Sequence, residues 1–206
     1  MKPLMHAGKP TATEPVQARR SKAAALIILG AVFSLSLPAG MEKAMAEPTV
    51  TRRTLQVEHV KINSSKKFAE VEAALESAVP RLDPEILVAL AKGDERRARE
   101  LERGSKLFIF LKRDHGAILE TTGRRGKALQ YEIGNPLTAT RMTRHQFPAA
   151  LYAPLRIVLY ENAAGGATFE YDKPSTLFGQ FGDEQVTAVS RELDAEIERV
   201  IRRAAE

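Results

Sequence analysis

The end of the chain carries the longest stripe of apolar residues at helical spacing. Its members follow steps of three and four residues, apart from the last step: Val186, Val189, Leu193, Ile197, Val200 and Ile201. Gly182-Asp183-Glu184 stands just before the stripe and offers a capping carboxylate. Because charged residues occupy many of the intervening positions, the pattern predicts an amphipathic closing helix that packs on a sheet.

Three earlier segments also have helical features. Apolar residues recur at helical spacing over residues 68–79 and predict a helix there. Asp83-Pro84-Glu85 combines a cap, a first-turn proline and an acid, so a second helix is expected from this point to Gly93. Residues 94–103 hold eight charged side chains, which favours a solvated helix over a surface that binds a polyelectrolyte.

Between these helices, alternating or continuous apolar runs predict strands. They cover residues 54–62, 107–111, 129–133, 155–159 and 169–171. The run 107–111 is apolar at every position, which predicts a strand buried on both sides or central in its sheet. The last two strands flank a loop containing glycine and should form a hairpin. Together these elements predict one α+β domain over residues 54–206, a two-layer sandwich in which amphipathic helices pack on a mixed β-sheet.

The net charge of +5 is concentrated at the start of the chain. Residues 1–46 contain six Lys and Arg against two Glu, which leaves 25 basic and 24 acidic side chains in the remainder. The nearly neutral remainder removes the main argument for nucleic-acid binding. The absence of cysteine excludes disulfides, thiolate metal sites and thiol nucleophiles.

Residues 1–46 have the three parts of a secretory signal peptide. A basic stretch ends at Arg19-Arg20-Ser21-Lys22, an apolar run covers residues 23–37, and Ala44-Met45-Ala46 supplies small residues for cleavage after Ala46. The run is shorter than the roughly 20 residues that span a bilayer core. We therefore expect a periplasmic or secreted protein with no stable membrane span after cleavage, exported by the general rather than the twin-arginine route. Residues 47–53 should be a linker.

Several motifs together carry a resemblance to a known family. They are Tyr131-Glu132-Ile133-Gly134-Asn135-Pro136, Ala153-Pro154-Leu155-Arg156-Ile157 with Tyr160-Glu161, Phe169-Glu170-Tyr171-Asp172, Lys112-Arg113-Asp114-His115 and Glu192-Leu193-Asp194. On these motifs, residues 54–202 resemble the family named domain of unknown function 302 (DUF302). The resemblance implies a compact two-layer α+β sandwich that is often homodimeric, and it implies no reaction.

Polar residues at strand ends are the candidate ligand-binding groups: Asp114, His115, Glu132, Asn135, Tyr171 and Asp172. For Asp114 and His115 the alternative is a solvated turn, in which Asp114 caps nearby amides and Gly116 supplies a positive φ. For Asn135 the alternative is a turn former that bonds nearby backbone. The other three are more often rim residues than catalysts.

The histidines after residue 46 are His59, His115 and His145, and their spacing matches no metal motif. His115 is the best single candidate for a metal ligand, because its ring follows an apolar strand and can titrate near neutral pH. The sequence leaves the cofactor unknown.

Two functions follow from these residues. The first is an exported, non-catalytic module that binds a small ligand or an envelope protein, since no assembled catalytic motif is evident. The second is an enzyme, or a metal- or haem-binding protein, whose cleft combines Asp114, His115, Asn135 and Tyr171. These alternatives differ in one geometric respect, which is whether the four side chains share a cleft.

Overall fold

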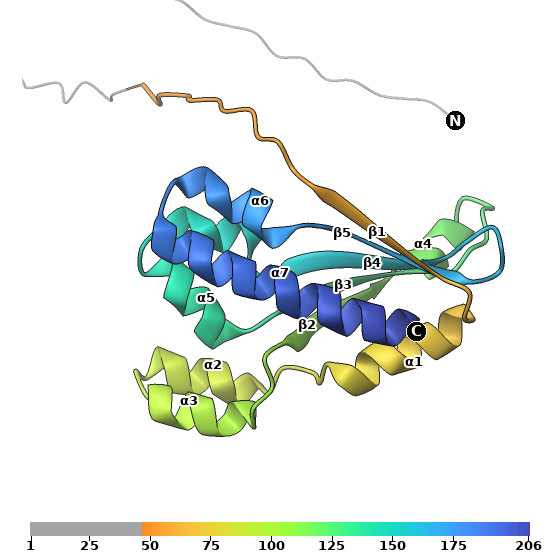
Figure 1. The fold of residues 1–206 in the computed structure, drawn as a ribbon, viewed down its shortest axis with the longest axis horizontal. Coiled ribbons are helices and arrows are strands. Elements are labelled where there is room, and N and C mark those ends of the chain that lie inside the picture. The colour runs from red at the N-terminus through yellow and green to blue at the C-terminus, as the bar shows by residue number, and fades with distance from the viewer. Residues whose placement is uncertain (1–46) are drawn as a thin grey trace, which may run out of the picture. The chain divides into compact units, whose positions relative to one another are not determined.

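Five strands form one sheet in the computed structural model, which describes residues 47–206 (Figure 1). The strands are β1 (His59–Ser64), β2 (Phe108–Asp114), β3 (Ala128–Gly134), β4 (Leu155–Glu161) and β5 (Ala167–Asp172), in the order β1-β5-β4-β3-β2. Residues 51–206 make one compact unit. The expected signal peptide at residues 1–46 lies outside the described residues.

The helices connect and cover these strands. They are α1 (Phe68–Ala78), α2 (Pro84–Ala91), α3 (Glu95–Glu102), α4 (His115–Glu120), α5 (Pro136–Thr143), α6 (Pro174–Phe178) and α7 (Glu184–Ala205), with the 3-10 helices η1 (Phe147–Tyr152) and η2 (Gly179–Phe181). Helices α1 and α7 lie together on one face of the sheet, as Figure 1 shows. The two-layer α+β architecture is therefore confirmed. Within residues 47–206, no helix combines the length and hydropathy needed to cross a bilayer.

Every pair of neighbouring strands is antiparallel, whereas the sequence suggested a mixed sheet. Strands β2, β3, β4 and β5 follow one another in the sheet as they do in the chain, and each reverses direction relative to the last. Helices α1, α2 and α3 carry the chain from β1 at one edge to β2 at the other.

The core lies between α7, α1 and the inner face of the sheet. Alternate strand residues such as Tyr131, Ile157 and Phe169 point into it and are at most 1% exposed. The predicted stripe of α7 is buried along its whole length. Its first turn is capped as expected, because the Asp183 carboxylate accepts hydrogen bonds from the backbone N–H groups of Gln185 and Val186.

Strand β1 begins five residues later than the alternation over residues 54–62 predicts. His59 faces Asp172, the last residue of β5. Pro174 then begins α6, so the neighbouring strand ends at this point. Residues 54–58 therefore have the composition of a strand but extend beyond the end of their partner.

Strand β2 lies at an edge of the sheet, so of the two positions predicted for it the central one is wrong. Its first residues are nevertheless buried on both sides. Ile109 belongs to the main core, while Phe108 packs in a second cluster with residues of α2, α3 and α5. The outer edge is also partly covered, because Ile109 N–H donates to Pro80 O (2.9 Å) and Leu82 N–H donates to Ile109 O (3.0 Å). Local cover rather than a central position explains the continuous apolar run.

Gly116 is needed for a close approach and not for a positive φ. It lies in the first turn of α4, outside the left-handed region. A Cβ at this position would stand 2.3 Å from the carbonyl oxygen of Gly126. The turn expected at Asp114-His115-Gly116 is thus a helix start, whose cap is the Asp114 carboxylate accepting from Ala117 N–H (2.9 Å).

We predict that Gly116→Ala lowers the free energy of unfolding by about 1–3 kcal/mol, because the added methyl group collides with backbone. Gly126→Ala is the matched control, since a Cβ there meets nothing within 4 Å, and it should change the free energy by less than about 0.5 kcal/mol. Urea unfolding of both variants measures the difference. Equal stability of the two would contradict the close approach.

Candidate functional site

Asn135 lies where β3 ends and α5 begins, and the residue is 7% exposed. Its Oδ1 accepts a hydrogen bond from Thr138 N–H (3.1 Å), which caps α5. Its Nδ2 donates to Glu102 Oε1 (2.5 Å) and lies 3.4 Å from the carbonyl oxygen of Ser105. Asn135 therefore serves as the structural cap and also lines two adjoining hollows.

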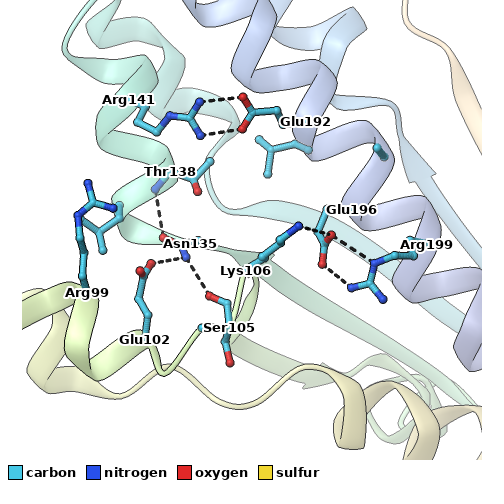
Figure 2. A pocket seen from close by; sticks show the side chains of 14 residues that line it. Arg99, Glu102, Ser105, Lys106, Asn135, Thr138, Arg141, Glu192, Glu196 and Arg199 are labelled. Atoms are coloured by element: carbon cyan, nitrogen blue, oxygen red, sulfur yellow. Dashed lines mark hydrogen bonds and ion pairs between the residues drawn. The ribbon is translucent and has the colours of Figure 1, made fainter.

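The first hollow, here called the polar cleft, has a volume of about 630 Å³ (Figure 2). It is bounded by α3, the segment before β2, α5 and α7. Its charged lining comprises Arg99, Lys106, Arg141 and Arg199 with Glu102, Glu192 and Glu196. Arg99 is also ion-paired with Glu95 of α3, so the four cations of the lining are nearly balanced by carboxylates.

Ion pairs hold the charges of the polar cleft in fixed places. Arg141 donates to both carboxylate oxygens of Glu192 (2.7 and 2.8 Å), which links α5 to α7. Glu196 accepts from Arg199 (2.5 Å), and Lys106 Nζ is 3.7 Å away. The hydrogen bond from Arg141 lowers the pKa of Glu192, and the one from Arg199 lowers the pKa of Glu196. Both carboxylates are therefore ionised at neutral pH.

The second hollow, here called the apolar pocket, has a volume of about 280 Å³. Its apolar lining includes Leu87 and Leu90 of α2, Phe110 of β2, Met142 of α5, Tyr152 of η1 and Phe178 of α6. The Tyr152 and Phe178 rings meet edge to face with centroids 5.9 Å apart. Asn135, Thr138 and Leu193 line both hollows. A polar and an apolar compartment thus adjoin at the end of β3.

The other candidate residues lie elsewhere. Asp114 and His115 lie at the opposite end of the β2–β3 pair, where Asp114, the last residue of β2, faces Leu129. Six strand residues at about 3.3 Å each place them roughly 20 Å from Asn135. His115 is exposed, and no group of three His, Asp or Glu within residues 47–206 is arranged to hold a metal ion.

Tyr171 and Asp172 are neighbours in β5 that face opposite sides of the sheet. The Tyr171 side chain is buried in the core, and burial raises the pKa of its hydroxyl to about 12. Asp172 and Glu132 face outward, where Glu132 accepts from Arg113 (2.7 Å). The structure therefore does not bring Asp114, His115, Asn135 and Tyr171 into one cleft.

Sequence reasoning found Asn135 but missed the groups around it. Arg141 lies in α5, Glu192 in α7 and Lys106 in the segment before β2, and only the tertiary packing brings them together. The apolar lining gave no separate signal, because its residues have the same spacing as core residues. Glu192 stood in one of the family motifs, which was the only available indication.

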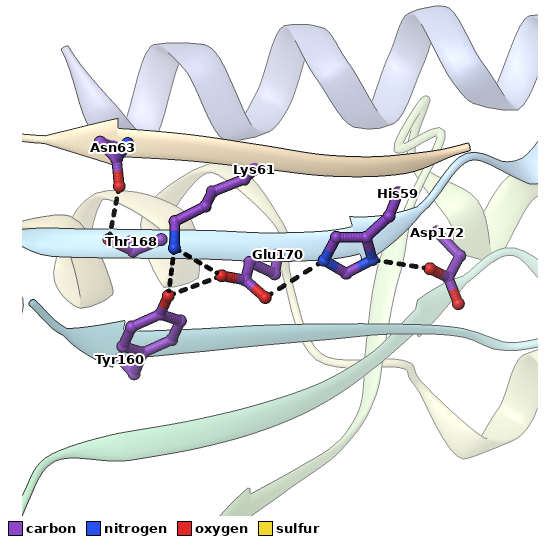
Figure 3. A network of polar contacts seen from close by, with 7 residues as sticks. All are labelled: His59, Lys61, Asn63, Tyr160, Thr168, Glu170 and Asp172. Carbon is purple, nitrogen blue, oxygen red and sulfur yellow. Dashed lines mark hydrogen bonds and ion pairs between the residues drawn. The ribbon is translucent and has the colours of Figure 1, made fainter. Parts of the chain in front are cut away.

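A polar network on the outer face of the sheet also went unpredicted (Figure 3). His59 Nδ1 is 2.8 Å from Asp172 Oδ1, and Nε2 is 3.1 Å from Glu170 Oε2. Glu170 also accepts from Tyr160 (2.6 Å) and from Lys61 (3.0 Å). An imidazole that meets a carboxylate at each nitrogen is best satisfied when both nitrogens carry protons.

These contacts shift two pKa values in opposite directions. The hydrogen bonds to Asp172 and then to Glu170 raise the pKa of His59 above its ordinary 6.5. Hydrogen bonds from Tyr160 and then Lys61 lower the pKa of Glu170 to about 2. Both groups lie on the solvated outer face of the sheet, where water and salt weaken such a pair.

We predict that His59 titrates above pH 6.5 in the folded protein. Because its folded pKa is raised, its contribution to stability is complete below pH 6.5 and is lost as the pH rises through the folded pKa. NMR titration of the imidazole protons measures this pKa. Asp172→Asn should lower this pKa. Glu161→Gln removes a carboxylate of β4 that pairs with Lys127, and it should leave the His59 pKa unchanged. A His59 pKa at or below 6.5 would count against the network.

The chain is similar to one family of proteins, both in sequence and in fold. The profile described as "Domain of unknown function DUF302" matches residues 95–204, which leaves β1, α1 and α2 outside the match. The crystal structure of an uncharacterised conserved DUF302 protein from Bacillus stearothermophilus has a similar fold, with a TM-score of 0.54. At 15% identity, the alignment covers 71% of this chain and 97% of that chain. No curated protein matches the sequence. Since the family profile spans more than half of the residues, the chain belongs to the DUF302 family.

Proposed function

We propose that the protein is an exported, non-catalytic module that binds a small amphipathic ligand. The observation that carries the proposal is the junction of the apolar pocket with the polar cleft at Asn135, Thr138 and Leu193. Ligand sites commonly combine an apolar interior with a few polar groups that fix orientation. The apolar part of the ligand would enter the pocket, and its head would lie in the cleft.

The dimensions support a ligand of modest size. An apolar cavity of about 150 Å³ can hold benzene, so the 280 Å³ of the apolar pocket suit a fused ring or a short branched chain. Burying roughly 100 Å² of apolar ligand surface would contribute about 2.5 kcal/mol. The head has the Thr138 hydroxyl and several guanidinium groups within the cleft. Lys106 has only a long contact with Glu196 (3.7 Å), so it is the cation most available to a head with one negative charge.

The charge states support binding over turnover. A general acid or base works best with a pKa near the operating pH. In the polar cleft the carboxylates of Glu192 and Glu196 have lowered pKa values, and the pKa of Arg141 is raised by Glu192. These groups therefore suit the orientation of a charged head more than proton transfer.

The apolar pocket can be tested with the dye anilinonaphthalene sulfonate, which joins aromatic rings to one anionic group. Ala139 of α5 lines the apolar pocket, so Ala139→Leu should fill it and weaken dye binding at least about tenfold. Arg141→Gln should weaken binding by a smaller factor, and more at low than at high salt. Fluorescence titration measures each affinity, with melting temperatures to confirm folding.

Two variants serve as controls for this experiment. Ala163→Leu makes the same change in the exposed loop between β4 and β5, and it should leave dye binding unchanged. His115→Ala should do the same, because His115 follows the far end of the β2–β3 pair. Unchanged affinity in Ala139→Leu would overturn the proposed site, and loss of binding in His115→Ala would favour the alternative cleft.

Export and homodimerisation are also part of the proposal. They rest on the signal-like pattern of residues 1–46 and on the family resemblance. Native mass spectrometry of the protein purified after export should give a subunit that begins at Glu47 and a complex of two subunits. A subunit that retains residues 1–46 would contradict the predicted cleavage, and a single subunit at micromolar concentration would contradict the dimer.

A further inference from the structure

Helix η1 presents large apolar side chains to solvent. Phe147 is 85% exposed and Leu151 is 76% exposed, and Pro148 and Ala150 between them are exposed as well. These four residues are here called the apolar tip. Transfer of a Phe or Leu side chain out of water is favourable, so leaving both exposed forgoes a substantial stabilisation. Such a surface commonly marks an interaction site.

The fold holds the apolar tip in this position. Ala149, within η1, is fully buried, and Tyr152 packs its ring against Phe178 and Phe181. The packing of Ala149 and Tyr152 therefore holds η1 in an orientation that leaves Phe147 and Leu151 facing solvent.

The charged side chain closest in sequence to the apolar tip is positive. Arg144 lies three residues before Phe147 and is exposed, and residues 136–152 contain no acid. One carboxylate contacts this segment: Asp183, which caps α7, accepts a hydrogen bond from Gln146 Nε2 (3.3 Å). Arg141 on the same segment is paired with Glu192. Exposed Phe and Leu beside an arginine match the interfacial region of an anionic bilayer.

We propose that the apolar tip docks on the surface of an anionic lipid membrane. Its area favours this partner over another protein, because two large side chains fall well short of the roughly 800 Å² per partner of a stable protein interface. Shallow insertion of about 5–10 Å suffices for interfacial apolar residues. The Arg144 guanidinium would meet lipid phosphates.

Docking would place the apolar pocket near the membrane. Tyr152, Ala153 and Pro154 follow the outward residues of the apolar tip directly and line that pocket. An amphipathic ligand could then pass between the lipid and the pocket. The membrane proposal itself requires only the apolar tip, so it stands or falls separately from ligand binding.

The absence of tryptophan allows a direct test. Phe147→Trp in the exported protein introduces a single tryptophan at the apolar tip. On addition of vesicles of phosphatidylglycerol and phosphatidylcholine, its emission should shift to shorter wavelength and be quenched by brominated acyl chains. Ile118→Trp is the matched control, since Ile118 is 61% exposed on α4, and its emission should change little.

Two further measurements test the contribution of Arg144 and the identity of the partner. Adding Arg144→Gln to Phe147→Trp should weaken vesicle binding about fivefold, because a cation near an anionic surface contributes about 1 kcal/mol. If brominated lipid does not quench the tryptophan introduced by Phe147→Trp, the proposal is overturned. A blue shift without vesicles that grows with protein concentration would also overturn it, because a second copy of the chain would then cover the tip.

Discussion

The packing of α7 against the inner face of the sheet determines both the stability of the fold and the shape of the polar cleft. Residues of the strands and of α1 share its buried stripe in one continuous core. Each fully buried aliphatic side chain of this stripe contributes about 1.5–3 kcal/mol. The adjacent side of the same helix carries Glu192 and Glu196. The contacts that stabilise the sheet therefore also fix the cleft carboxylates.

The end of β3 separates the two compartments of the candidate site. Gly134-Asn135-Pro136 changes the chain from strand to helix, and the buried Asn135 amide is satisfied by the backbone of Thr138 on one side and by Glu102 on the other. A buried amide without these partners would cost about 1–3 kcal/mol. Asn135 thus joins α3 to α5 and fixes the boundary between the polar cleft and the apolar pocket.

The sequence predicted elements better than it predicted neighbours. The α7 stripe, its Asp183 cap and the strands from 107 onward depend on local spacing, so they were correct in position. The edge position of β2 and the start of β1 depend on partners distant in sequence, so the sequence did not predict them correctly. The candidate residues show the same difference. A local motif indicated Asn135, whereas the role of His59 depends on Asp172, which is 113 residues away in the chain. Arg141 and Glu192 meet only after α5 and α7 pack.

The cover over the first part of β2 also limits how copies of the protein can associate. An open strand edge offers unpaired N–H and C=O groups to any other chain. Here the backbone of residues 80–82 occupies that edge beside Ile109, and the later part of the strand carries Lys112 and Arg113. Extension of the sheet from β2 into a continuous intermolecular ribbon is therefore blocked at its start and disfavoured by charge further along. Crowded, newly folded chains gain protection against aggregation through this edge.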